Sequence, residues 1–171
     1  MTNKIVIGID PGVKGGIAIF IDGEYETSFK MPSIENPIKA SKVKHLLDTE
    51  DLALLLLRYK RNYSPYNCAY IEKAFAPAGQ AGASYMQNYG MILGICVGLG
   101  IPYVEISPKD WQKSQLDIKD CFKTRKDGTP VRDKAVSVRK VNGLYPELKL
   151  KAKDDGIADA ILIAKHGVET L

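Results

Sequence analysis

Long apolar runs and clustered cysteines are scarce in this 171-residue chain, and each shortage argues against a class of protein. The longest apolar stretches are Leu52–Leu57 and Met91–Leu99, far below the roughly 18–20 residues that cross a bilayer. No basic start with an apolar segment behind it indicates a secretory signal. The three cysteines are scattered and odd in number, which is typical of free thiols in a reducing compartment. We therefore expect a cytoplasmic protein without a membrane segment.

Internal repeats, low-complexity tracts and linkers are also missing from the sequence. The length suits one compact domain, and 45% apolar residues are enough to build a core. We therefore expect residues 1–171 to form a single domain.

The net charge of +4 is modest, but the charge is unevenly distributed. Residues 109–153 hold 13 Lys or Arg against 6 Asp or Glu, a net +7, so the rest of the chain carries −3. A basic third beside an acidic remainder suits a protein that holds a nucleic acid against a carboxylate-lined site. A solvated, lysine-rich surface would give the same pattern.

Apolar runs and turn signals in the first third predict an antiparallel meander of three strands, at 4–10, 15–21 and 24–31. Asp22-Gly23 between the last two is a strong hairpin signal. Further along, the sequence predicts helix 41–62, strand 67–72, helix 83–99, strand 101–106, a short helix from Ser107-Pro108, a basic loop at about 115–132, and helices 133–145 and 155–167. This order predicts an α/β unit.

Two acids stand at the ends of predicted strands. Asp10 closes an apolar strand and is followed by Pro11-Gly12, a turn that leaves its carboxylate accessible. A buried acid is costly unless it is paired or bound to a cation, although an ordinary Asp-Pro-Gly turn is the alternative. Glu72 ends the fourth strand. A right-handed crossover would place that strand beside the first, and Glu72 next to Asp10.

A second acidic group begins the C-terminal helix. Asp155 and Asp159 are four residues apart and share a helix face, where two like charges destabilise the helix. A bound cation would explain the pair, and a favourable acid near the helix N-terminus is the alternative for Asp155 alone. Asp154 would point elsewhere or cap the helix. These acids come without His or Cys ligands, and oxygen-only sites favour Mg²⁺ or Mn²⁺. Such a set can hold two ions for in-line hydrolysis of a phosphodiester.

Three ordered motifs resemble one nuclease family over nearly the whole chain. They are IGIDPGVKGGIAI at 7–19, YIEKAFAPAGQ at 70–80 and DDGIADAILIA at 154–164, with IPYVEISPKDWQK between the last two. The sequence resembles the RuvC-type Holliday-junction resolvases, especially the short bacteriophage and prophage forms, within the RNase H-like nuclease superfamily. The resemblance implies an RNase H-like fold: a five-stranded mixed sheet, with three antiparallel strands plus two parallel ones, flanked by helices.

The resemblance also implies roles for the acids. Asp10 would bind both metal ions, with Glu72 and Asp159 as further ligands. Bacterial members place the fourth acid three residues before the last one, which is Gly156 here. We assign the fourth position to Asp155 and keep Asp154 in reserve.

The same resemblance implies the DNA contacts. Phe75, three residues after Glu72, matches an aromatic that stacks at the opened junction, with a core phenylalanine as the alternative. Lys134 matches a basic residue that holds the scissile phosphate. Further phosphate contacts are expected from the basic loop, at Lys119, Lys123, Arg125 and Lys126.

A homodimer is implied because a four-way junction presents two symmetric strands to cut. The glycines of the 83–99 helix, Gly90, Gly94 and Gly98, would allow close helix packing.

The expected activity is structure-selective cleavage of branched DNA, dependent on Mg²⁺ or Mn²⁺, in a bacterial cell or a phage-infected host. The alternatives are a related nuclease with relaxed preference for forks and flaps, and a non-catalytic junction-binding module. An ATPase of the actin type, which would need a nucleotide cofactor, requires two such domains and a second phosphate loop. The chain is too short for that.

Overall fold

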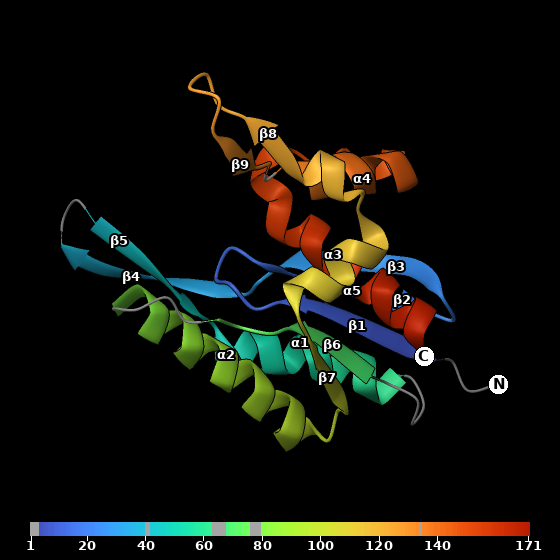
Figure 1. The fold of residues 1–171 in the computed structure, drawn as a ribbon. Coiled ribbons are helices and arrows are strands. Elements are labelled where there is room, and N and C mark those ends of the chain that lie inside the picture. Colours follow the sequence, from blue (N-terminus) through green and yellow to red (C-terminus); the bar gives the residue numbers. More distant parts are fainter. Residues whose placement is uncertain (1–3, 40–41, 63–67, 76–79, 134) are drawn as a thin grey trace.

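The computed structural model describes residues 4–39, 42–62, 68–75, 80–133 and 135–171. A five-stranded sheet in the order β3-β2-β1-β6-β7 lies at its centre (Figure 1). β1 (Ile5–Asp10), β2 (Gly16–Ile21) and β3 (Glu24–Lys30) form an antiparallel meander. β6 (Cys68–Glu72) and β7 (Tyr103–Ile106) continue the sheet in parallel with β1. The predicted sheet of three antiparallel and two parallel strands is confirmed.

The β2–β3 turn illustrates how local sequence sets this meander. Asp22 and Gly23 both adopt positive φ, at 52° and 88°, which is the conformation that an Asp-Gly hairpin favours. The Asp22 carboxylate accepts the backbone N–H of Lys4 at 2.8 Å. The hairpin is thereby joined to the start of β1, as well as to its own strands.

Helices cover both faces of the sheet (Figure 1). One face packs against α1 (Thr49–Asn62) and α2 (Gln80–Leu99), with Ile5, Ile7 and Ile9 of β1 in that core. The other face holds Val6 of β1 against α3 (Pro108–Gln115), α4 (Val136–Leu144) and α5 (Asp155–Thr170). Because β1 is buried on both faces, it reads as a continuous apolar run.

α5 packs directly on the backbone of β1. A Cβ added at Gly8 would lie 2.2 Å from the carbonyl oxygen of Ala160 and 2.4 Å from the Ala164 nitrogen. Only glycine permits that approach. The middle of α5 is therefore held directly against β1.

The prediction of one helix over 41–62 was wrong in its first part. Residues 42–47 form β5 (Lys42–Leu47), which pairs with β4 (Ser33–Lys39) in a separate hairpin, and α1 begins only at Thr49. KVKHLL begins with the alternation of a strand, and the Asp48 carboxylate caps α1 by accepting the Asp51 N–H at 3.0 Å. Leu46 and Leu47 have helical spacing to the leucines of α1, and for this reason the sequence predicts one continuous helix.

The basic segment 115–132 is more ordered than the predicted loop. It holds the 3₁₀ turn Ile118–Cys121 and the short hairpin of β8 (Phe122–Thr124) and β9 (Pro130–Arg132). Gly128 has φ +83° and donates its N–H to the Arg125 carbonyl at 3.0 Å, so an Asp-Gly pair again makes the turn. The β4–β5 and β8–β9 hairpins both project from the central sheet (Figure 1). Two further 3₁₀ turns, Pro146–Leu148 and Ala152–Asp154, lead into α5. Over the described residues, no helix is long and apolar enough to cross a membrane.

Candidate active site

Asp10 and Glu72 lie at neighbouring strand ends. In the parallel β1–β6 pair, Ile9 is opposite Ile71, and the next residue of each strand is the acid. The chain turns away directly after Asp10, whose carboxylate accepts the Gly12 N–H at 3.3 Å. The sequence predicted that the strand ending in Glu72 lies beside the strand ending in Asp10, and the β1–β6 pairing confirms this.

The start of α5 meets the turn after Asp10 through backbone contacts that include a parallel bridge between Gly15 and Gly156. A Cβ added at Gly156 would lie 2.3 Å from the Lys14 carbonyl oxygen and 2.5 Å from the Gly15 Cα. An acid at position 156, as in the bacterial pattern, would force this contact apart. The close packing explains why glycine, and not the acid of the bacterial pattern, stands at this position.

Three carboxylates interact electrostatically with Asp10. The pKa of Asp10 is raised from 3.8 to about 8, first by burial and then by the negative charges of Asp159, Glu72 and Asp155, while the Gly12 N–H lowers it in part. The structure therefore brings together the strand-end acids and both predicted acids of α5. Within the described residues, no three Asp, Glu, His or Cys side chains form a ready-made metal-binding group. The carboxylates are neighbours that a cation would have to draw closer.

Asp154 and Asp155 have different surroundings. Asp155 contributes to the raised pKa of Asp10. The Asp154 carboxylate instead accepts the Lys151 N–H at 2.9 Å and lies 3.6 Å from the Lys30 ammonium. Of the two alternatives that the sequence left open, the surroundings of Asp155 match a place in the carboxylate cluster, whereas Asp154 has a partner of its own.

Glu72 is positioned by a residue that the sequence analysis did not single out. Trp111 of α3 is fully buried and donates its indole N–H to Glu72 Oε2 at 2.6 Å. A buried indole N–H needs an acceptor, and this is the only tryptophan of the chain. The sequence therefore indicates that the Trp111 indole has a hydrogen-bond acceptor, but it does not show that the acceptor is Glu72.

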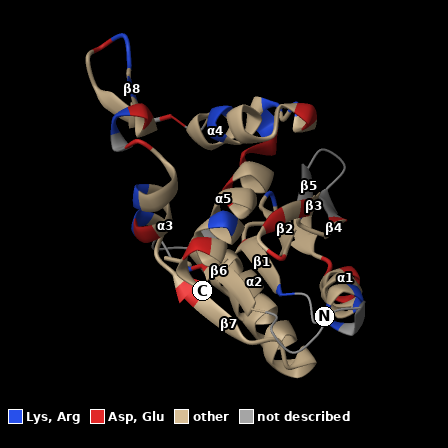
Figure 2. Cartoon of the chain, turned by 90° about the vertical axis from the view of Figure 1, so that its right-hand side faces the viewer, with Lys and Arg blue, Asp and Glu red and all other residues tan. Residues whose placement is uncertain are grey.

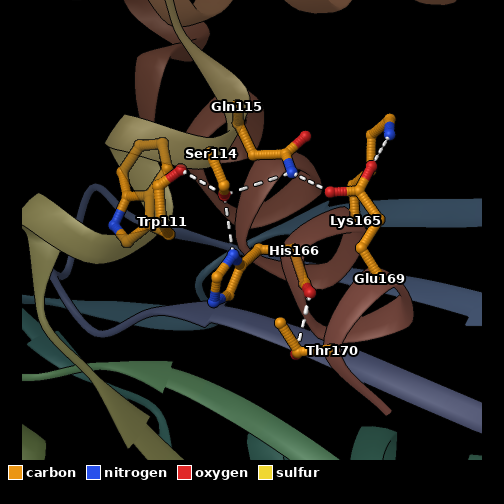
Figure 3. Close-up of polar contacts among 7 residues, drawn as sticks. All are labelled: Trp111, Ser114, Gln115, Lys165, His166, Glu169 and Thr170. Atoms are coloured by element: carbon orange, nitrogen blue, oxygen red, sulfur yellow. Dashed lines mark hydrogen bonds and ion pairs between the residues drawn. The ribbon is translucent and has the colours of Figure 1, made fainter.

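A polar network holds α3 against α5 beside this contact (Figure 3). The Ser114 hydroxyl lies 2.7 Å from His166 Nδ1, and Gln115 donates to Glu169 Oε2 at 2.5 Å. Lys165 also pairs with Glu169, and the pKa of Glu169 is lowered because Lys165 and Gln115 stabilise its charged form more than burial disfavours it. The network fixes the helix that carries Trp111, and thereby the Glu72 side chain.

Tyrosines of α2 border the same region and were also missed. Burial raises the pKa of Tyr85 to about 12, with smaller contributions from the Asp10 and Glu72 carboxylates, so its phenol stays neutral near the acids. The Tyr89 hydroxyl donates to Glu105 and accepts the backbone N–H of Ala74. Tyr89 thus anchors the segment that follows Glu72.

Phe75, the residue after Ala74, is 64% exposed, so the alternative of a core phenylalanine was wrong.

The predicted DNA-contacting cations lie on the β8–β9 hairpin and the turn before it (Figure 2). Lys119, Lys123, Arg125 and Lys126 are all exposed. Lys123 has a partner, the buried Asp133, at 3.4 Å. Arg139 of α4 reaches the same carboxylate at 2.7 Å and lowers its pKa, which ties the hairpin to α4. Lys134 lies outside the described residues.

The arrangement defines a class of fold before it defines any activity. A mixed five-stranded sheet of this strand order, with helices on both faces, is the RuvC-type version of the RNase H-like fold. Solved structures agree. The chain superimposes on Thermus thermophilus RuvC in complex with a Holliday junction substrate with a TM-score of 0.55, at 16% identity, over 98% of this chain and 94% of that one. A second Thermus thermophilus RuvC structure matches with a TM-score of 0.52, at 15% identity, over 97% and 95%. No protein-family model and no curated protein matches the sequence.

Proposed function

We propose that this chain is a metal-dependent endonuclease of branched DNA that resolves four-way junctions, acting as a single nuclease domain in the cytoplasm of a bacterial or phage-infected cell. The observation that carries the proposal is the partly buried Asp10, whose pKa is raised first by burial and then by the charges of three further carboxylates near the same end of the sheet. Such a cluster is unfavourable without a counter-charge and suits a hard divalent cation. The RuvC-like fold supports DNA as the substrate, since one of the matching structures holds a Holliday junction.

Asp10, Glu72, Asp155 and Asp159 would hold one or two Mg²⁺ or Mn²⁺ ions, with Asp10 shared between them. When bound, the ions would supply an activated water and stabilise the leaving oxygen of the phosphodiester. The protein contributes the placement of the ligands. The indole N–H of Trp111 fixes the position of one Glu72 carboxylate oxygen. The Gly15–Gly156 contact holds α5 beside Asp10.

The exposed residues around the cluster would contact DNA. Phe75, at the surface directly after β6, is available to stack on an unpaired base. Lys119, Lys123, Arg125, Lys126 and Lys134 would contact backbone phosphates and supply affinity rather than sequence preference.

We further propose a homodimer formed through α2, so that two active sites face the two strands of a junction. The exposed face of this helix carries Gly90, Gly94 and Gly98, where an added Cβ would meet nothing within 4 Å. Met91 and Val97 are exposed beside them, at 39% and 66%. An apolar, glycine-lined helix face allows two helix backbones to approach closely.

The direct test is binding and cleavage of four-way, forked and linear DNA at one salt concentration, in Mg²⁺ and in EDTA, because unmatched salt would blur structural preference. We expect cutting only with Mg²⁺ and the highest rate on the four-way junction. Equal rates on forks and junctions would support a nuclease of relaxed specificity. Binding of the junction without cutting would show a non-catalytic module, and the absence of both would refute the proposal.

Replacing Asp155 and Asp154 one at a time should identify the fourth ligand. Asp155→Asn is expected to weaken Mn²⁺ binding and to slow cleavage on the order of 100-fold or more, because it removes a ligand charge from the cluster. Asp154→Asn should keep Mn²⁺ affinity near the wild-type value, because this carboxylate pairs with Lys30. Isothermal titration with Mn²⁺ gives the comparison, and the reverse ranking would exchange the two assignments.

Trp111→Phe should weaken metal binding without unfolding the protein. The variant keeps an aromatic ring in the core but removes the N–H that holds Glu72, and loss of such a supporting hydrogen bond typically costs about 10–100-fold in metal affinity. Tyr25→Phe is a matched control, since it removes the hydroxyl that contacts Ser28 elsewhere in the fold. Equal Mn²⁺ affinities for Trp111→Phe and the control would show that the indole has only a packing role.

A further inference from the structure

A cavity of about 240 Å³ opens beside the Gly15–Gly156 contact, and Gly15 is part of its lining. It lies between the turn after β1, the end of β3, the β4–β5 hairpin and the 3₁₀ turn before α5. Its polar lining comes from Lys14, Lys30, Ser33, His45, Lys153 and Asp154. These residues are distant in sequence, and none of them is used by the site described above.

The lining is basic. Three lysines face one acid, and the charge of that acid is already compensated. One oxygen of Asp154 lies 3.6 Å from Lys30, and the other accepts the Lys151 N–H at 2.9 Å. Lys14 and Lys153 are exposed. Because Lys30 is paired with Asp154, the hollow keeps the two positive charges of Lys14 and Lys153, which repel each other unless an anion joins them. The cavity therefore suits an anionic group.

The position of the cavity indicates where that anion comes from. Lys14 of the cavity lies in the turn that follows Asp10, and Asp154 of the cavity directly precedes Asp155. The turn after β1 and the start of α5 therefore contribute residues both to the cavity and to the carboxylate cluster. A DNA strand whose scissile phosphate reaches the carboxylates would present its neighbouring phosphates to this hollow. The cavity is smaller than the roughly 300–1,000 Å³ of sites that enclose whole small ligands. It fits one phosphate group better than a complete nucleotide.

We propose that this cavity binds a backbone phosphate of the strand being cut, adjacent to the scissile phosphate. The inference rests on the proposed nuclease function and adds a second phosphate contact, on the β4–β5 side, separate from the β8–β9 hairpin. Phosphate contacts carry no sequence information. The cavity would set which bond along the strand lies at the carboxylates, and it would contribute the same affinity to every sequence.

The test compares two double variants that each remove two positive charges. Lys14→Gln/Lys153→Gln empties the cavity of two cations and keeps the Lys30–Asp154 pair. Lys4→Gln/Arg58→Gln is the control, because Lys4 precedes β1 at the end opposite Asp10 and Arg58 is exposed on α1. Affinity for a four-way junction and a linear duplex is measured by fluorescence anisotropy in Ca²⁺ over a series of salt concentrations. Mn²⁺ affinity without DNA is measured alongside.

For Lys14→Gln/Lys153→Gln we expect about a tenfold loss of affinity for both DNAs and a shallower dependence of log K on log salt, by roughly one unit of slope. Mn²⁺ affinity should stay at the wild-type value, and the control should keep the wild-type slope. A slope equal to that of the control would overturn the inference and leave the proposed nuclease intact. The inference would also be overturned if inorganic phosphate bound the cavity of the wild type without competing with DNA, because the cavity would then bind a free anion. If the wild type binds no DNA, both proposals fail together.

Discussion

Asp10→Asn is expected to lower the rate of metal-dependent cleavage of branched DNA by on the order of 1,000-fold or more, while junction binding survives. Asp10 is the carboxylate that the other three acids surround, and amide oxygen is a weaker ligand for a hard cation than carboxylate. Losing several kcal/mol of stabilisation of the transition state corresponds to this factor, since about 1.4 kcal/mol is tenfold. Single-turnover cleavage of a labelled junction measures the rate, and anisotropy in Ca²⁺ measures binding.

Glu72→Gln and Asp159→Asn should give the same loss, because each removes one charge from the cluster. Glu26→Gln is the matched control, since Glu26 is exposed on β3. Cleavage at the wild-type rate by any of the three cluster variants would refute the assignment of that residue to the metal site. Loss of junction binding together with cleavage would instead indicate a damaged fold.

The second large effect concerns stability and pH. The pKa of Asp10 is raised from 3.8 to about 8, so between these values the folded protein holds a proton that the unfolded chain releases. Unfolding is therefore favoured as the pH rises, and the metal-free protein should lose on the order of 2–4 kcal/mol of stability between about pH 4 and pH 8. The acids that face Asp10, namely Asp159, Glu72 and Asp155, all act in the same direction. The lowered pKa values of Asp133 and Glu169 affect stability only at more acidic pH, where protonation removes their contribution.

Urea unfolding at pH 5 and pH 8 in EDTA tests this, with the fluorescence of the single tryptophan, Trp111, as the probe. Asp10→Asn should remove most of the difference between the two pH values and be more stable than the wild type at pH 8. Mg²⁺ should restore wild-type stability at pH 8, because it binds only the folded cluster. If the wild type is as stable at pH 8 as at pH 5 in EDTA, the pKa of Asp10 is not raised in the folded protein and this prediction is wrong.

Much of the site could be predicted because its parts are local. Asp10 and Glu72 each end an apolar strand, and the handedness of the crossover between them leaves one arrangement for neighbouring parallel strands. Asp155 and Asp159 share a helix face by spacing alone. The Asp-Gly pairs at 22–23 and 127–128 are likewise local turn signals, although the sequence predicted a loop around the second. These features depend on a few adjacent residues and on fixed backbone periods.

The sequence by itself therefore predicted the five strands of the central sheet, the acids at the ends of two of them and a cluster built from carboxylates alone. Tertiary structure alone decided which side chains meet across long separations: that Trp111 donates to Glu72, that Asp154 pairs with Lys30, and that Lys14 and Lys153 line one cavity. It also decided that residues 42–47 form a strand, since pairing with β4 outweighs the helical spacing of their leucines. Each of these outcomes depends on the packing of distant segments, such as the contact at Gly156, and no local pattern encodes that distance.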